Sequence, residues 1–373
     1  MKSVLLFYNW FLPAYKAGGP IQSIGNLVKS LDENYKFYII CSNTDHGETE
    51  PLKNIISDKW LPFEAHRCEV IYLSKPNINF RRLKDLINKV NPDVIITNGI
   101  YSLPFSIFPA IISKSHTVLT VRGMLHPGAL SQKKLKKSVF LFFFKLLKLH
   151  KKITFHATDD VEAGYIQEQL GSSVKIKVAG NFPHINSYID PPPKEQGLIL
   201  GSVGLISPMK NHHLVLLALK QCSANITYHI YGPVKDSIYW NECKELISEL
   251  PANITVEYHG EVPPHQIKDK IKEFHFFILP SKSENFGHAI FEALSAGRPV
   301  ITSNYTPWNS LEKNRAGFNV DINNIKTISE SVDRAVNQSN QEYLQWTHST
   351  REYALRAINI EDIKEQYRQL FNA

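Results

Sequence analysis

Two acidic side chains, Glu284 and Glu292, lie eight positions apart in the most informative stretch of the chain, FHFFILPSKSENFGHAIFEALSAGRPVITS. This separation is too long for the two acids to share one metal ion through local helical spacing. It suits a long ligand that is held at two points, with an anionic group between them on the backbone amides of residues 285–288. The alternative interpretation is one solvated turn acid and one acid on a helix surface.

A strand, a turn and a helix must position these acids. Residues 274–280 predict a short buried strand that ends at Pro280, and the polar residues 281–287 predict a turn. Helical spacing follows over residues 288–296, with Gly297 as the C-terminal stop, and a second strand is predicted over 299–302. In such units, ligands lie beyond the carboxyl ends of the strands and beside the helix N-terminus.

The segment SENFGHAIFEALSAGRPVI, with its E-x7-E pair and with Gly287, Gly297 and Pro299, resembles the signature of the retaining glycosyltransferases of family 4. The resemblance spans nearly the whole chain. It implies an α/β protein with the GT-B fold, in which two facing Rossmann-like domains with parallel sheets enclose an interdomain cleft. It also implies that Glu284 orients the hydroxyls of the donor sugar and that Glu292 holds the ribose hydroxyls.

A lysine lies where the donor diphosphate would need positive charge. Lys210 belongs to the loop SVGLISPMKN after a predicted strand, a suitable position for neutralising phosphate. Family members usually have an arginine next to the glycine of this loop and a lysine five positions later. Lys210 matches the lysine, whereas Leu205 occupies the place of the arginine, and Arg122 or Lys235 could compensate. By the resemblance, the departing diphosphate would also contact the amides of Asn285, Phe286 and Gly287.

Three glycines are further candidates for contacts with the donor. Gly18 and Gly19 lie in the loop PAYKAGGP after the first predicted strand, and paired glycines let the backbone approach a ligand closely. This loop resembles the family's glycine loop over the donor diphosphate. Gly260 follows another predicted strand, and the resemblance implies that the segment after it lines the nucleobase. The alternative for the first loop is an ordinary glycine turn.

Arg122 and His126 follow the predicted strand 118–121, and active sites of this architecture are built just past strand ends. Many family members have a histidine in this loop that faces the donor sugar. Arg122 occupies that place and His126 follows four residues later, so either side chain is a candidate for the sugar and acceptor side. The alternative is a surface loop with a structural arginine.

The segment 132–152, QKKLKKSVFLFFFKLLKLHKK, combines many lysines with a core of Phe and Leu. One interpretation is a basic amphipathic segment that contacts an anionic membrane surface. The other is an internal helix whose apolar side chains pack into the first domain while its lysines are solvated. The sequence supports both equally.

Composition sets the outer limits of the prediction. With 373 residues the chain is too long for one ordinary core, and its net charge of +7 favours anionic partners. The four cysteines are scattered and predict buried, reduced thiols in a cytoplasmic protein, which could lie at the inner face of the plasma membrane. No D-x-D, Walker A or G-x-G-x-x-G pattern occurs, so we expect no metal and no cofactor in the transfer step.

Alternating strand and helix patterns predict two doubly wound domains. We expect an N-terminal, acceptor-side domain over residues 1–188, a stiff linker over 189–194 and a nucleotide-sugar domain over 195–355. The resemblance implies that residues 356–373 return as a helix to the first domain. The amphipathic pattern of this helix has Ile363, Tyr367 and Leu370 on one face.

These features together predict a metal-independent retaining glycosyltransferase. Its donor would be a nucleoside-diphosphate sugar, with UDP slightly favoured. The acceptor would be a glycan or a lipid-linked oligosaccharide in cell-surface polysaccharide synthesis, and we expect no nucleic-acid partner. The absent arginine at Leu205 motivates one alternative, a catalytically weak binding or partner subunit on the same fold. A two-domain nucleotide-dependent oxidoreductase is a second alternative, disfavoured by the missing dinucleotide fingerprint.

Overall fold

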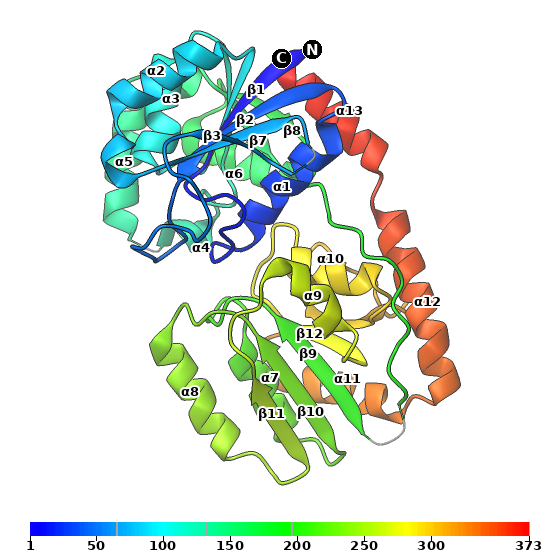
Figure 1. Ribbon diagram of the computed structural model, residues 1–373. Coiled ribbons are helices and arrows are strands. Elements are labelled where there is room, and N and C mark those ends of the chain that lie inside the picture. The colour runs from blue at the N-terminus through cyan, green and yellow to red at the C-terminus, as the bar shows by residue number, and fades with distance from the viewer. Residues whose placement is uncertain (65, 132, 195–196, 373) are drawn as a thin grey trace. The chain divides into compact units, whose positions relative to one another are not determined.

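The computed structural model describes residues 1–64, 66–131, 133–194 and 197–372 (Figure 1). Gln132, where the predicted basic segment starts, and residues 195 and 196, where the predicted second domain starts, lie outside the described residues. The chain forms two compact units. The first unit contains residues 1–182 and 360–373, and the second contains residues 183–359.

An eight-stranded sheet forms the centre of the first unit, in the order β3-β4-β2-β1-β5-β6-β7-β8. All neighbouring pairs are parallel except β3 with β4. Its strands are β1 (Lys2–Phe7), β2 (Tyr35–Ser42), β3 (Trp60–Pro62), β4 (Cys68–Leu73), β5 (Val94–Asn98), β6 (His116–Thr120), β7 (Thr154–Ala157) and β8 (Lys175–Val178). Its α-helices are α1 (Gly19–Leu31), α2 (Phe80–Val90), α3 (Phe108–Ile112), α4 (Pro127–Ser131), α5 (Lys134–Leu146), α6 (Asp160–Leu170) and α13 (Ile360–Phe371).

The second unit has a six-stranded, fully parallel sheet in the order β11-β10-β9-β12-β13-β14. Its strands are β9 (Leu198–Val203), β10 (Ile226–Tyr231), β11 (Ile254–Tyr258), β12 (Phe276–Leu279), β13 (Val300–Ser303) and β14 (Gly317–Val320). Its helices are α7 (His212–Leu219), α8 (Ser237–Ser248), α9 (Pro264–Ile271), α10 (His288–Ser295), α11 (Ile325–Asn337) and α12 (Asn340–Ala357).

Helices cover both faces of the second sheet. One apolar layer joins its strands to α7, α8 and α11, and a separate layer joins them to α10. Strand β12 contributes to both layers, because its four residues, all buried, alternate between the two faces. Burying a large apolar side chain of this kind stabilises the fold by about 1.5–3 kcal/mol. The predicted doubly wound α/β architecture is confirmed.

In the second unit, the strand predicted over 274–280 corresponds to β12, which is limited to Phe276–Leu279. The strand predicted over 299–302 corresponds to β13, which begins and ends one residue later, at Val300 and Ser303. In the first unit, β6 begins at His116 and ends at Thr120, one residue before the predicted end. The two short strands β3 and β8 were not predicted at all. All four cysteines are buried and free, as expected.

The division between the units differs from the predicted one. The first unit ends at Phe182 instead of residue 188, and the predicted linker 189–194 lies within the second unit. The guanidinium of the buried Arg298 donates hydrogen bonds to the carbonyl oxygens of Ile189 (2.8 Å) and Asp190 (2.9 Å). Because these bonds tie the segment to the second sheet, it does not act as a free spacer.

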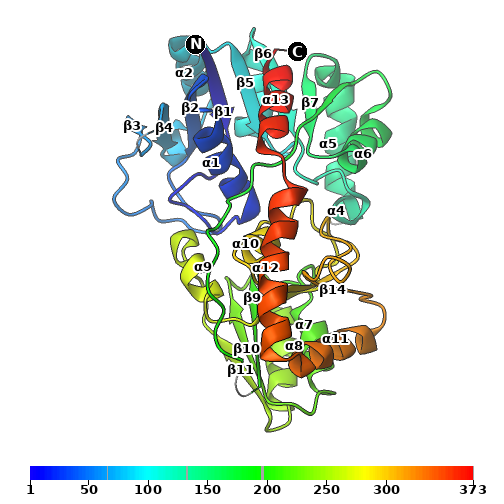
Figure 2. The same ribbon diagram turned by 90° about the vertical axis from the view of Figure 1, so that its right-hand side faces the viewer.

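The last helix, α13, packs within the first unit (Figure 2). Its face of Ile363, Tyr367, Leu370 and Phe371 is buried, and the His116 ring lies 3.1 Å from the Leu370 carbonyl oxygen. The return to the first unit comes at Ile360 instead of residue 356, since α12 continues to Ala357.

Candidate active site

The strand order of the second sheet fixes where a ligand is expected. The chain moves outward in one direction from β9 through β10 to β11, then returns to the other side of β9 with β12. In open parallel sheets, ligands bind beyond the carboxyl ends of the two strands that flank such a reversal. Here these strands are β9 and β12, and they are followed by residues 204–211 and 280–287.

Lys210 and Glu284 meet at this point, one from each loop. The Lys210 ammonium lies 2.5 Å from a Glu284 carboxylate oxygen, and the Ser281 hydroxyl donates to the same oxygen at 2.6 Å. The exposed fractions of the two side chains are 21% and 11%, so the pair is accessible but largely desolvated. The structure therefore brings together two of the predicted site residues that are 74 positions apart.

Backbone and amide contacts hold the two loops in register. The Lys282 N–H donates to the Met209 carbonyl at 2.8 Å, and the Asn211 amide donates to the Pro280 carbonyl at 3.2 Å. Asn211 has a positive φ of 65° and directly precedes α7. Ser281 and Asn211 were not identified from the sequence, although both are polar residues just past a buried strand.

The turn before α10 is shaped for a helix N-terminus. Gly287 has a φ of +75°, and a Cβ there would lie 3.3 Å from the Trp308 ring nitrogen. That ring nitrogen donates to the Phe286 carbonyl at 2.6 Å, and the first bond within the helix runs from the Phe291 N–H to the Gly287 carbonyl. The N–H groups of a first helical turn point out of the helix end, where they favour an anion.

Glu292 lies in the second turn of α10, so the turn and the helix separate it from Glu284, as predicted. Burial raises the pKa of the Glu292 carboxyl to about 7. Removing a carboxylate from water disfavours its charged form. Near neutral pH this group is therefore divided between its protonated and ionised forms.

Three glycines form a backbone surface beyond β9, β10 and β11. The Gly232 N–H donates to the Gly260 carbonyl at 2.7 Å, and Gly260 has a φ of +73°. A Cβ on Gly232 would lie 1.8 Å from the Gly204 carbonyl oxygen, so no side chain fits there. A bare backbone of this kind permits close approach of a flat ligand.

Leu205 is half-buried in the loop after β9. The Lys235 N–H donates to the carbonyl of the adjacent Ile206 at 3.1 Å, and the Lys235 side chain is exposed. The exposed ammonium of Lys235 therefore extends from a backbone position close to Leu205, which occupies the place of the family's arginine.

In the first unit, Gly18 has a φ of +73° and precedes α1, whose first residue is Gly19. The loop before these glycines is fixed by the buried Asp45. Its carboxylate accepts hydrogen bonds from the N–H groups of Tyr15 (2.9 Å) and Lys16 (3.1 Å). Asp45 was missed by sequence reasoning, although an acid three residues beyond a buried strand was a usable signal.

Arg122 is engaged by side chains of its own unit. Its guanidinium donates to the Asn181 amide oxygen (2.8 Å), the Ser23 hydroxyl (2.9 Å) and the Asn98 amide oxygen (3.1 Å). The residue has a φ of +56°, an uncommon conformation for a side chain of this size. These contacts match the structural-arginine alternative, and a role in sugar or acceptor binding stays a prediction.

His126 lies at the start of α4. Its Nδ1 accepts a hydrogen bond from the Gly128 N–H at 3.0 Å, and its ring meets the edge of Tyr165 at a centroid distance of 5.0 Å. His126 therefore contacts Gly128 and Tyr165, whereas Arg122 contacts Ser23, Asn98 and Asn181. The predicted acceptor role of His126 stays a prediction.

Residues 187–353 match the family model for glycosyl transferases group 1. Over this range, which is most of the second unit, the chain is similar to group 1 glycosyltransferases. Two relatives fit this assignment. A Staphylococcus aureus poly(ribitol-phosphate) alpha-N-acetylglucosaminyltransferase is 25% identical over 47% of this chain and 35% of its own length. The O-antigen chain mannosyltransferase RfbU of Salmonella typhimurium is 23% identical over 61% of this chain and 64% of its own. The matches thus span less than two thirds of either relative.

The fold of the whole chain resembles that of solved structures. The Anabaena protein Alr3699/HepE, in complex with UDP and glucose, superimposes with a TM-score of 0.75 over 100% of both chains at 16% identity. The chain has the GT-B fold, as predicted. Among the described residues, no helix is long and apolar enough to cross a membrane.

Proposed function

We propose that this protein transfers a sugar, with retention of anomeric configuration, from a nucleoside-diphosphate sugar to a hydroxyl of a cell-surface glycan. The observation that carries the proposal is the Lys210–Glu284 pair at the strand reversal of the second sheet, which lies within the range similar to group 1 glycosyltransferases. Activities named for the two bacterial relatives, one acting on poly(ribitol-phosphate) and one on O-antigen chains, support an acceptor of this class.

In this proposal the pair opens when the donor binds. The Lys210 ammonium moves to the diphosphate, and the Glu284 carboxylate accepts hydrogen bonds from sugar hydroxyls. Each charge then exchanges one partner for another, so neither is left unpaired in a largely desolvated place. The amides of Asn285, Phe286 and Gly287 at the start of α10 add further donors to the phosphate.

The chemical step follows from this arrangement. The bond between the anomeric carbon and the phosphate oxygen breaks, and its electron pair leaves with the diphosphate. The acceptor oxygen attacks the same face, and its proton passes to the departing phosphate oxygen. The positive charge of the Lys210 ammonium lowers the energy of the negative charge that develops on the departing phosphate.

UDP is our preferred nucleotide because the Anabaena structure contains UDP and glucose. A Cβ on Gly260 would meet no atom within 4 Å, so the proposed donor site has space for a flat base beside this residue. A thermal-shift screen of the purified chain against UDP, GDP and their sugars tests the choice. We expect stabilisation by one nucleotide class, and a response to GDP alone would replace UDP in the proposal.

The test of the activity is transfer and slow donor hydrolysis by purified protein. We expect both reactions in the wild type and their loss in Glu284→Gln and Lys210→Met. Lys313→Met serves as the matched control, because Lys313 is a charged residue outside the site. Stable binding of the nucleotide sugar without any turnover would instead favour the partner-subunit alternative, which Leu205 motivates.

We also infer that the segment 133–152 contacts an anionic membrane surface. Leu135, Val139, Phe142, Phe143 and Leu146 are all exposed along one face of α5. The opposite face packs into the core through Leu141 and Phe144. Exposed lysines, among them Lys134, Lys136 and Lys145, flank the apolar face and favour anionic head groups.

Flotation with lipid vesicles tests this contact. We expect binding to vesicles that contain phosphatidylglycerol, weaker binding to phosphatidylcholine, and loss of binding in the triple variant Phe142→Ser, Phe143→Ser, Leu146→Ser. Ile238→Ser on α8 is the control, since Ile238 is an exposed apolar residue of the other unit. Equal flotation of the triple variant and the wild type would contradict the inference.

A further inference from the structure

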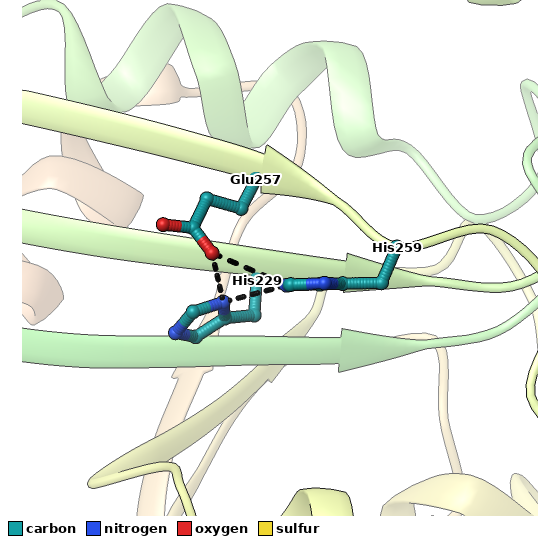
Figure 3. Close-up of side chains that lie close together, drawn as sticks. All are labelled: His229, Glu257 and His259. Carbon is teal, nitrogen blue, oxygen red and sulfur yellow. Dashed lines mark hydrogen bonds and ion pairs between the residues drawn. The ribbon is translucent and has the colours of Figure 1, made fainter.

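Two histidines and a glutamate gather at the edge of the second sheet, with His229 on β10, Glu257 on β11 and His259 just beyond β11 (Figure 3). His229 pairs directly with Glu257 across the two strands. His259 follows Glu257 by two positions, so it extends from the same face of the sheet. The alternating residues Tyr228 and Ile230 point to the opposite face, where they are part of the core.

The three ligand atoms form a nearly equilateral triangle. His229 Nδ1 lies 2.9 Å from His259 Nε2 and 3.4 Å from a Glu257 carboxylate oxygen, and the same oxygen lies 3.5 Å from His259 Nε2. A tetrahedral zinc ion with ligand bonds of about 2.0–2.1 Å holds its ligand atoms roughly 3.3–3.4 Å apart. The two distances to the Glu257 oxygen already match this value. The distance between the two histidine nitrogens would need to increase by about half an ångström.

The surrounding rings hold the ligands in place. The His259 ring stacks on Tyr231 with a centroid distance of 4.5 Å and an interplanar angle of 11°. The His229 ring stacks on Phe274 at 6.2 Å. Ring positions fixed by packing reduce the ordering that a metal must impose. The exposed fractions of the side chains are 14% for His229, 33% for His259 and 49% for Glu257, so an ion can enter from solvent.

We propose that His229, Glu257 and His259 bind a divalent transition metal of the zinc class. Two imidazole nitrogens and one carboxylate suit Zn²⁺ and its spectroscopic substitute Co²⁺, whereas Ca²⁺ and Mg²⁺ prefer oxygen ligands. Three protein ligands leave one position for water. The site is separate from Lys210 and Glu284, which follow β9 and β12, and it takes no part in the proposed transfer step.

The metal would fasten an edge strand. It would join β11 to β10 one residue before Gly260, whose carbonyl accepts the Gly232 N–H. A bound ion therefore stabilises the strand ends on which the glycine surface is built. We expect the effect to be local to β10, β11 and the turns that follow them.

Titration of tag-free, chelator-treated full-length protein with Co²⁺ tests the site. We expect a saturable visible absorption spectrum at one equivalent, displaced by Zn²⁺, and a Zn²⁺-dependent rise in melting temperature. The variants His259→Ala and Glu257→Gln should lose the saturable spectrum and the thermal shift, while His265→Ala should keep both. His265 is a matched control because it is an exposed histidine on the nearby helix α9.

Melting of each variant without metal checks that it folds. Because Glu257 and His259 are more exposed than His229, their variants keep the test meaningful if His229→Ala does not fold. A lack of saturable Co²⁺ binding, or binding that survives both His259→Ala and Glu257→Gln, would overturn the proposal. Transfer activity after chelation is a separate measurement, so a failure here leaves the proposed function untouched.

Discussion

The two sheets have the same strand sequence around their reversal points but use positive charge in different ways. The order β4-β2-β1-β5-β6 in the first unit corresponds to β11-β10-β9-β12-β13 in the second. In the first unit, Arg122 donates to neutral oxygens of Asn98, Ser23 and Asn181. In the second, Lys210 pairs with the carboxylate of Glu284.

This difference separates a structural cation from an exchangeable one. The planar guanidinium of Arg122 joins the end of β5, helix α1 and the segment at Asn181 through fixed hydrogen bonds. An ammonium paired with a carboxylate can instead exchange that partner for phosphate, while the carboxylate turns to hydroxyl donors. We therefore expect loss of Arg122 to affect folding first and loss of Lys210 to affect chemistry first.

The largest expected effect is on catalysis. Lys210→Met should lower the transfer rate by about 100- to 1,000-fold, since removing one preorganised group that stabilises transition-state charge costs about 2.7–4 kcal/mol. Initial rates at saturating donor measure it. A rate within a factor of three of the wild type would show that Lys210 has no catalytic role that distinguishes it from the structural Arg122.

Arg122→Met should destabilise the first unit by about 3 kcal/mol, because it removes charge-assisted hydrogen bonds to the buried oxygens of Asn98, Ser23 and Asn181. Hydrogen exchange measures the effect by region. We expect faster exchange in α1 and β5 and unchanged exchange in β9 and β12. Arg122→Lys should be intermediate, since one ammonium cannot satisfy the three acceptors in the same geometry. Unchanged protection in α1 would contradict the structural role.

The Glu292 carboxyl should make the stability of the second unit depend on pH. Its folded carboxyl has a pKa of about 7, raised from an ordinary value of 4.5. Between these two values the folded state binds more protons than the unfolded state, so this group's contribution to stability falls as pH rises from 4.5 to 7. Glu292→Gln removes that dependence.

Relative to the wild type, Glu292→Gln should therefore gain about 3 kcal/mol of unfolding free energy between pH 4.5 and pH 8. Urea unfolding followed by circular dichroism at both pH values measures the gain. A difference between variant and wild type that is the same at the two pH values would show that the carboxyl titrates normally.

The smallest expected effect concerns the missing arginine. Leu205→Arg should tighten nucleoside-diphosphate binding about tenfold, since a charge-assisted hydrogen bond contributes about 1.5–3 kcal/mol, part of which is used in ordering the long side chain. Calorimetry with the nucleotide selected by the screen measures it. Lys235→Met in the wild type should weaken binding by a similar factor if Lys235 compensates.

Sequence patterns predicted the fold well where a strand is a continuous apolar run, as in β12. They failed for β3, which has three residues, and for β8, whose sequence KIKV is exposed at alternate positions. Apolar periodicity is weak in such short edge strands.

The residues of the candidate site were named from the sequence, but their contacts were not. Lys210 and Glu284 meet only because β9 and β12 are neighbours, and this pairing depends on strand order. The same holds for Arg122, whose partners Ser23 and Asn181 come from distant segments. Local spacing does not encode long-range hydrogen bonds of this kind, so the structural interpretation of Arg122 could only be one alternative.

The most direct test of the exchangeable pair is calorimetry with the free nucleoside diphosphate and with its sugar conjugate, on Lys210→Met and Glu284→Gln. Lys210→Met should weaken binding of both ligands by tenfold or more, because it removes the phosphate contact. Glu284→Gln should weaken binding of the sugar conjugate while the free diphosphate binds as in the wild type. Wild-type affinities of both ligands in both variants would contradict the account.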